Sequence, residues 1–145
     1  MNEQESHQLA SQIRTTTTRL IKKLRKKSET GSSLSLTERS VIALLDQHKQ
    51  MLPSELAATE KITTQSMSQI LNHLLELGCI IREASTTDKR KVYISLSPLG
   101  QEMLYRVRHE REEWLFKAIT EVCTDEEREL ISRAMAPLTK IIDYE

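Results

Sequence analysis

Hydrophobic residues recur at every third or fourth position over most of this chain, which is the spacing of amphipathic helices. The first such stripe predicts a helix that ends near Ser28, and it consists of Leu9, Ile13, Thr17, Leu20 and Leu24. The opposite face of this helix is basic, with Arg19, Lys22, Lys23, Lys26 and Lys27. Residues 30–33 (TGSS) are typical of a loop, so a second helix is expected to begin soon after them.

The second helix has two alternative capping arrangements. Ser35 can pair with Glu38 in a capping box, or Thr37 can cap the helix alone. The residues expected to be buried are Val41, Leu44 and Leu45. Residues 48–50 are expected to form the fraying end of this helix.

Two short helices joined by a tight turn come next. Pro53 suits the first turn of a third helix, where its missing N–H costs nothing. The expected inward residues of this helix are Leu56 and Ala57. After a turn at residues 60–62, Thr63 or Thr64 can cap a fourth helix, and Gly78 suits the position just past its end. The apolar stripe of the fourth helix is Met67, Ile70, Leu71, Leu74 and Leu75. This order is typical of a helix-turn-helix.

The apolar pattern then changes from the period of a helix to that of strands. Residues 80–83 and 91–96 predict two short strands, and residues 84–90 between them predict a polar and basic hairpin tip. Ser97 and Pro98 cap and open a long helix. The apolar stripe of this helix is Leu99, Met103, Val107, Trp114 and Ala118.

A capping box of Thr124 and Glu127 predicts a last helix. Its apolar stripe is Leu130, Ile131, Ala134, Met135, Leu138, Ile141 and Ile142. At about 1.5 Å per residue, the helix that begins at Pro98 runs well beyond a small central domain. The apolar stripes of the terminal helices therefore need a partner, and a second copy of the chain is the simplest one.

These elements predict a mostly α-helical fold with a small β-hairpin wing, that is, a winged helix-turn-helix flanked by dimerisation helices. The expected division places the winged helix-turn-helix in residues 35–97. Residues 1–34 and 98–145 are expected to supply the N-terminal and C-terminal dimerisation helices.

The distribution of charge along the chain is compatible with binding to nucleic acid. The 145 residues carry 21 Lys and Arg against 21 Asp and Glu, and this zero net charge at first argues against nucleic acid. The charges are segregated, however, because residues 1–36 hold seven basic against three acidic residues, and residues 98–145 hold seven against eleven. Contact with phosphates depends on local basic surface, which is present here.

The two cysteines do not predict a metal or redox site. Cys79 and Cys123 form no CxxC pair and have no His at metal-ligand spacing, so no cofactor is expected. Cys79 is expected to be a buried, inert thiol, and Cys123 is expected to be more exposed. Unpaired cysteines, the lack of a signal peptide and the lack of an apolar run of about 20 residues predict a cytoplasmic protein without a membrane span.

The exposed face of the predicted fourth helix is polar but uncharged. Its candidate contact residues are Thr63, Thr64, Gln65, Ser66, Ser68, Gln69, Asn72 and His73. Amide side chains can pair bidentately with adenine in the major groove, so this face suits the reading of double-stranded DNA. A structural surface helix more often carries paired charges, and residues 63–75 carry none. The alternative interpretation is a merely polar helix.

The hairpin tip supplies a second candidate contact. Lys89, Arg90 and Lys91 can clamp phosphates or enter the minor groove, and Asp88 can hold Arg90 in one rotamer. The alternative is an ordinary solvated charge cluster. Arg82 at the start of the strand is either a DNA backbone contact or a simple rim charge. The lysines of the first helix are expected to be solvated, with a secondary steering role, and the alternative is that they contact flanking phosphates.

Catalysis is not expected. The chain has no Gly-rich phosphate loop, no nucleophile elbow and no pair of histidines with a carboxylate at metal spacing. The main rival to DNA binding is a winged-helix module that binds another protein, because a fold does not fix its function.

Residues 36–100 resemble the MarR (multiple antibiotic resistance regulator) family. The resemblance rests on Leu36-Thr37, Glu55-Leu56-Ala57, the run from Leu71 to Gly78, Asp88-Lys89-Arg90-Lys91 and Leu96-Ser97-Pro98-Leu99-Gly100. The Asp-x-Arg wing followed by a strand is its most specific part. The last segment departs mildly from a Leu-Thr-x-x-Gly helix start but keeps the capping hydroxyl.

The resemblance implies a homodimeric transcription factor, most often a repressor, that binds a pseudo-palindromic operator in double-stranded DNA. It implies that Asp88 and Arg90 are the wing pair and that Thr63 to His73 is the recognition helix. It also implies that a small phenolic or other anionic effector can release the DNA.

Two departures from the family pattern stand out. Leu52 replaces a frequent Ser or Thr cap, at a cost of roughly 1 kcal/mol, and the first helix lacks the cysteine and tyrosines of peroxide-sensing members.

Overall fold

The computed structural model describes residues 1–31 and 33–145, so Ser32 of the predicted loop lies outside the described residues. It contains six helices and three strands among these residues. They are α1 (Glu3–Lys26), α2 (Leu36–His48), β1 (Gln50–Met51), α3 (Pro53–Glu60), α4 (Thr64–Glu76), β2 (Ile80–Ala84), β3 (Val92–Leu96), α5 (Pro98–Val122) and α6 (Asp125–Ile142). The prediction of a mostly helical chain with a β-hairpin is confirmed.

Local capping interactions place most helix starts where the sequence predicts them. Ser35 and Glu38 form a capping box at α2, so the alternative cap by Thr37 is not used. A second capping box, formed by Thr124 and Glu127, opens α6. Leu52 at the start of α3 supplies no side-chain cap, as predicted.

A third strand, β1, was not predicted. Lys49 has a positive φ of 68°, which ends α2 and turns the chain so that residues 50–51 pair with β3 instead of fraying. The antiparallel sheet has the order β1-β3-β2, and Met51 lies opposite Ile94. The pairing of Ile80 with Leu96 begins the β2–β3 hairpin.

The core lies where the helix-turn-helix packs against the sheet. Its largest fully buried side chains are Val41, Leu45, Leu56, Met67, Leu71, Leu74, Ile80 and Ile94.

Two predictions about which residues are buried in this core were wrong. Ile42 is buried on α2, whereas Leu44 is only partly buried, because the inward face of α2 is turned toward α5 as well as toward the sheet. Leu75 remains 39% exposed, because α4 directs Leu74 rather than Leu75 into the core.

Two glycines bring the start of α5 onto the end of α4. Gly78 has a φ of 74° and follows the C-terminus of α4, as its position in the sequence predicts. A Cβ on Gly100 would lie 2.0 Å from the backbone oxygen of Cys79, so only glycine allows this approach. Ser97 joins the two segments, because its Oγ accepts a hydrogen bond from the Gly100 N–H and donates one to the Gly78 carbonyl.

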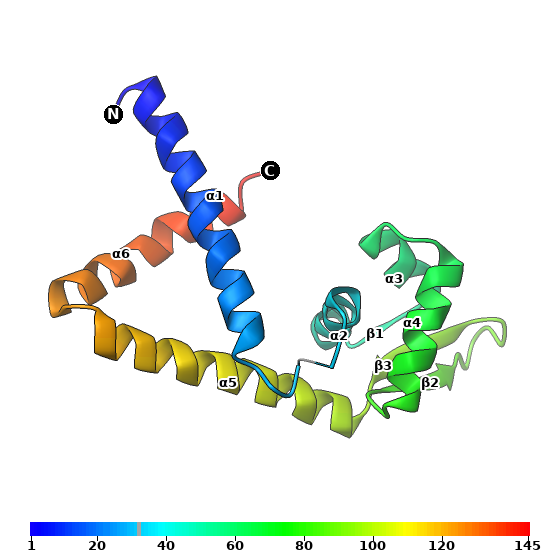
Figure 1. Ribbon diagram of the computed structural model, residues 1–145. Coiled ribbons are helices and arrows are strands. Elements are labelled where there is room, and N and C mark those ends of the chain that lie inside the picture. Colours follow the sequence, from blue (N-terminus) through cyan, green and yellow to red (C-terminus); the bar gives the residue numbers. More distant parts are fainter. Residues whose placement is uncertain (32) are drawn as a thin grey trace.

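The terminal helices extend away from the winged helix-turn-helix. Figure 1 shows α5 running from the hairpin as a long arm, with α1 and α6 on the side of the molecule opposite α3 and α4. Neither α1 nor α6 buries a single residue. Leu130 is 67% exposed and Ile142 is 80% exposed. None of the helices in the described ranges is both long and apolar enough to cross a lipid bilayer.

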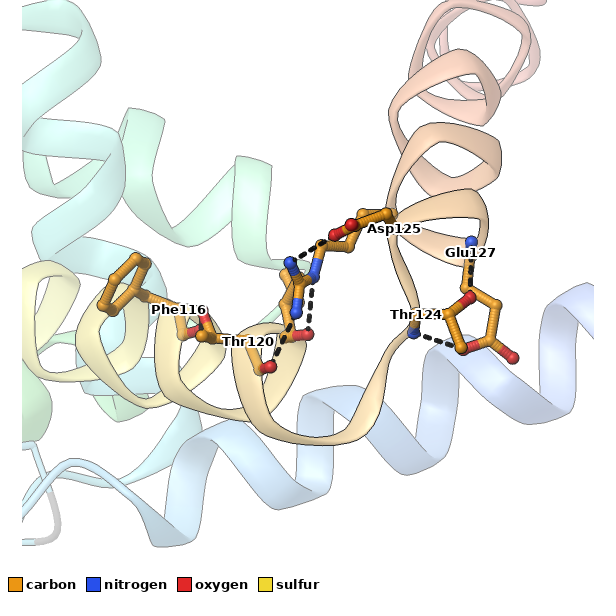
Figure 2. A network of polar contacts seen from close by, with 7 residues as sticks. Phe116, Thr120, Thr124, Asp125 and Glu127 are labelled. Carbon is orange, nitrogen blue, oxygen red and sulfur yellow. Dashed lines mark hydrogen bonds and ion pairs between the residues drawn. The ribbon is translucent and has the colours of Figure 1, made fainter.

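Arg128 fixes the corner between α5 and α6, where Figure 2 labels two of its partners, Thr120 and Asp125. Its guanidinium donates to the carbonyl oxygens of Ile119 and Thr120, at 3.2 and 2.7 Å, which satisfies acceptors at the C-terminal end of α5. The same group pairs with Asp125 at 2.9 Å in the first turn of α6. This corner therefore sets the direction in which α6 presents its apolar stripe.

Candidate nucleic-acid interface

The fourth helix, α4, is held on the surface by its apolar side and by its N-cap. The turn before it contains Lys61 in the left-handed region, with a φ of 55°. The Thr63 hydroxyl accepts a hydrogen bond from the Ser66 N–H at 3.1 Å, so Thr63 rather than Thr64 is the cap. Met67 and Leu71 are buried on the inner side, which directs the intervening polar residues outward.

The outward residues at the start of α4 are available for contact. The exposed side chains are Thr63, Thr64, Gln65, Ser66, Ser68 and Gln69. Thr63 and Ser66 bond to each other through their hydroxyls at 3.0 Å. Within the described parts of the chain, the side chains of Gln65, Ser68 and Gln69 form no hydrogen bond with other residues. Both the donor and the acceptor of each amide are thus free to meet a base edge.

Asn72, one turn further on, is engaged by the sheet. Nη2 of Arg82, on β2, donates a hydrogen bond of 2.7 Å to Oδ1 of Asn72. Both residues are exposed, so this contact lies on the surface beside α4. From the sequence, Asn72 is expected to contact DNA and Arg82 to be a DNA backbone contact or a rim charge; the structure brings the two side chains together.

His73 is also engaged by the protein. Its Nδ1 lies 2.7 Å from Oε1 of Glu38, while the other carboxylate oxygen of Glu38 accepts the Ser35 N–H. The His73 side chain is 46% exposed, whereas that of Glu38 is largely buried. Glu38 therefore both caps α2 and ties α2 to the second half of α4. Sequence reasoning missed this role, because the two residues lie 35 positions apart.

The hairpin tip is shaped by short-range hydrogen bonds. Oδ1 of Asp88 accepts bonds from the backbone N–H of Arg90 at 3.1 Å and from its side-chain Nε at 3.3 Å. The predicted Asp88–Arg90 contact is therefore present. Ser85 fixes the other side of the tip, because its Oγ accepts the N–H groups of Thr87 and Asp88.

The basic side chains of the tip point into solvent. Arg90 is 92% exposed, and Lys89 and Lys91 are exposed as well. An exposed pair such as Asp88–Arg90 adds little to stability. Its effect is to orient one guanidinium at the tip of the hairpin whose strand β2 contacts α4 through Arg82 and Asn72.

The two cysteines lie apart from this surface. Cys79 is buried, as predicted, with its Sγ 3.5 Å from the sulfur of Met103. Burial raises the pKa of the Cys79 thiol, and the nearby Glu38 charge raises it further. A raised pKa keeps the thiol protonated, which is the opposite of what a reactive cysteine needs. Cys123 is partly exposed at the end of α5.

Comparison with known proteins gives the family. A family model described as MarR family matches residues 32–91. An HTH-type transcriptional regulator of Mycobacterium leprae is 30% identical over 135 residues, which cover 93% of each chain. The regulator FarR of Neisseria gonorrhoeae is 30% identical over 103 residues, covering 71% of this chain and 70% of FarR.

Solved structures of other proteins have the same fold. One crystal structure is of a protein from Pseudomonas aeruginosa described as a candidate transcriptional regulator. It matches this chain with a TM-score of 0.85 and 30% identity, covering 99% of this chain and 100% of that one. The fold also matches Staphylococcus aureus MepR bound to an oligodeoxyribonucleotide, with a TM-score of 0.71, 17% identity and coverage of 93% and 98%. The relatives are named as transcriptional regulators, not as enzymes. The chain belongs to the MarR family of winged helix-turn-helix transcriptional regulators.

Proposed function

We propose that this regulator is a repressor that binds a pseudo-palindromic DNA operator as a homodimer. The observation that carries the proposal is that the start of α4 is exposed and uncharged, while the tip of the β2–β3 hairpin exposes basic side chains. The first half of α4 lies in the major groove and reads base edges, chiefly through Gln65, Ser68 and Gln69. The wing contacts the phosphates or the minor groove through Lys89, Arg90 and Lys91.

The terminal helices support the homodimer. Apolar side chains along α1 and α6 are exposed, among them Leu9, Leu20, Ile21, Leu130, Met135 and Ile142. A two-fold pairing of these helices would remove this apolar surface from water, which favours the dimer. Residues 1–34 and 98–145 accordingly form the dimer interface, and residues 35–97 bind the operator.

The dimer sets the spacing of the operator. Two recognition helices related by a two-fold axis enter successive major grooves about 34–36 Å apart, which corresponds to half-sites about one helical turn apart. The DNA-bound MepR neighbour has the same fold and supports this mode of binding. Because the wing contacts phosphates, the affinity falls steeply as salt rises.

Selection of duplexes from a random pool tests the proposal directly. The purified chain is expected to enrich an inverted repeat with half-sites centred about 10 base pairs apart. If no sequence is enriched and no duplex binds at low ionic strength, the proposal is wrong and a protein partner for α4 becomes the favoured function. Enrichment of a single, unrepeated site would contradict the homodimer but not the binding of DNA.

The proposed function includes release of the regulator from DNA when a small molecule binds. A cavity of about 160 Å³ lies between α2 and α5, where the long arm meets the winged helix-turn-helix. A ligand bound there contacts α5 and also α2, the helix that Glu38 ties to α4. This position supports a change in the placement of α4 when the cavity is filled.

A further inference from the structure

His73 ends a row of exposed polar side chains along α4. Gln65, Gln69 and His73 follow one another at intervals of four residues, so they are neighbours on one face of the helix. All three are exposed. The two glutamines carry free amides, whereas His73 is bonded to Glu38 of α2. One end of the surface expected to meet DNA is therefore a titratable ring, which the neighbouring helix holds in place.

The bond to Glu38 determines which ring nitrogen of His73 carries the hydrogen. Nδ1 lies 2.7 Å from Oε1 of Glu38. A carboxylate oxygen accepts hydrogen bonds and does not donate them, so the hydrogen is on Nδ1. In the neutral ring the other nitrogen, Nε2, then carries a lone pair and is an acceptor. The His73 side chain is 46% exposed and that of Glu38 only 10%, so Nε2 lies on the outer side of the pair.

The place of His73 along α4 puts it near the edge of a DNA groove. Eight positions separate it from Gln65, which is about 12 Å at about 1.5 Å per residue, and the major groove is about 12 Å wide. When the start of α4 lies among the bases, His73 therefore lies toward the phosphates that border the groove. The adjacent Asn72 is bonded to Arg82 of β2, so a positive charge lies at the same end of this face.

Glu38 is the acidic group that acts on the ring at close range. Among the described residues, no other carboxylate lies within ion-pair distance of His73. The other ionisable groups around the pair are Glu76 on the next turn of α4, Arg82 on β2 and Cys79, while Glu60 on α3 is bonded to Ser40 of α2. Burial keeps the Cys79 thiol protonated, because it raises the pKa of that group. The charge next to His73 is thus that of Glu38.

We infer that His73 is a proton-dependent phosphate contact and that Glu38 is its positioning residue. A neutral ring held by Nδ1 presents a lone pair to a phosphate oxygen, and two acceptors form no hydrogen bond. When Nε2 gains a proton, the same nitrogen donates a charge-assisted hydrogen bond to that oxygen. The affinity for the operator therefore rises as the pH falls through the range in which histidine becomes charged. This inference rests on the proposed function.

Fluorescence anisotropy of the full chain with the selected duplex, at constant ionic strength, tests the inference. The affinity is expected to be about tenfold higher at about pH 5.5 than at about pH 8. His73→Gln should remove most of this difference, because an amide does not titrate. His48→Gln is the matched control, because His48 is an exposed histidine on α2 without an ion pair among the described residues, and it should keep the difference. A wild-type change below about twofold, or an unchanged difference in His73→Gln, would overturn the inference.

Glu38→Ala tests the positioning role. Without the carboxylate, either ring nitrogen of His73 can carry the hydrogen, so the difference between the two pH values should fall below about threefold. Glu55→Ala is the control, because it also removes a carboxylate from a helix start but leaves the bond to His73 in place. An undiminished difference in a folded Glu38→Ala variant would overturn the role of Glu38. Circular dichroism checks the folding, and if Glu38→Ala does not fold, the position of the ring hydrogen decides.

Nitrogen NMR of the isotope-labelled chain locates this hydrogen without DNA. At about pH 8 it is expected on Nδ1 of the neutral His73 ring, and a hydrogen on Nε2 would overturn the inference whatever the chain binds. If the duplex binds equally at both pH values, the inference fails and the proposed function stands. If no duplex binds at either pH, the proposed function itself fails, and the inference falls with it.

Discussion

Arg82 of β2 donates a 2.7 Å hydrogen bond to the side-chain oxygen of Asn72 on α4. This contact uses one of the two lone pairs of the Asn72 oxygen and holds that oxygen toward β2. A bidentate contact with adenine requires both a donor and an acceptor. Gln69, whose amide is free, is therefore better suited to direct base reading than Asn72.

This difference predicts distinct effects on base preference. Gln69→Ala is expected to change the preferred base at one position of each half-site, with a loss of about 1–3 kcal/mol for the original base. Asn72→Ala should leave the preference largely unchanged. Random-pool selection with each variant measures both effects. A uniform loss of affinity for unrelated sequences in Gln69→Ala would mean that Gln69 only positions the protein.

The wing is expected to act through charge. Arg90→Ala should weaken operator binding and reduce the dependence of affinity on salt by about one phosphate contact. Fluorescence anisotropy over a series of salt concentrations measures both quantities. Glu83→Ala, near the tip end of β2 in the same hairpin, is the control, because it removes a negative charge and should not weaken binding. Unchanged affinity and salt dependence in Arg90→Ala would remove the wing from the mechanism.

Most of the fold follows from short-range signals that are readable in the sequence. The pair Ser35 and Glu38 lies within one helical turn, and the hairpin pair Asp88 and Arg90 is separated by a single residue, so their interactions depend on local geometry alone. The same holds for Gly78, whose positive φ ends α4.

Long-range pairings could not be predicted in this way. Strand β1 exists because two residues pair with β3, which lies more than forty positions further along the chain, and a strand so short has no periodic pattern of its own. The bond between Glu38 and His73 likewise depends on how α2 packs against α4.

Glu38 should matter for stability more than its capping role alone suggests. Glu38→Ala removes a largely buried carboxylate that bonds both Ser35 and His73, so a loss of about 1–3 kcal/mol in the free energy of unfolding is expected. Glu55→Ala is the matched control, because Glu55 accepts the Leu52 N–H at an exposed helix start and should cost less than about 1 kcal/mol. Urea unfolding at one fixed protein concentration measures both variants, and equal losses would contradict this account of Glu38.

Glu110 should make the fold sensitive to acid. Hydrogen bonds from Thr30 and Ser28 lower the pKa of the Glu110 carboxyl below its ordinary value. A lowered pKa in the folded state means that this stabilisation is complete above the unfolded pKa of about 4.3 and is lost as the pH falls through the folded value. Glu110→Gln should therefore be less stable than the wild type at neutral pH, with the difference shrinking on acidification. Thermal unfolding from pH 7 to pH 3 measures this, and a constant difference would contradict it.

The central claim is that two copies of the chain place two α4 helices on one operator. Sedimentation of the purified chain with a fluorescent duplex from the random-pool selection measures this most directly. The account predicts a dimer in free solution and a complex of two chains per duplex, which dissociates as salt rises. A stable monomer that binds no duplex at low ionic strength would contradict it.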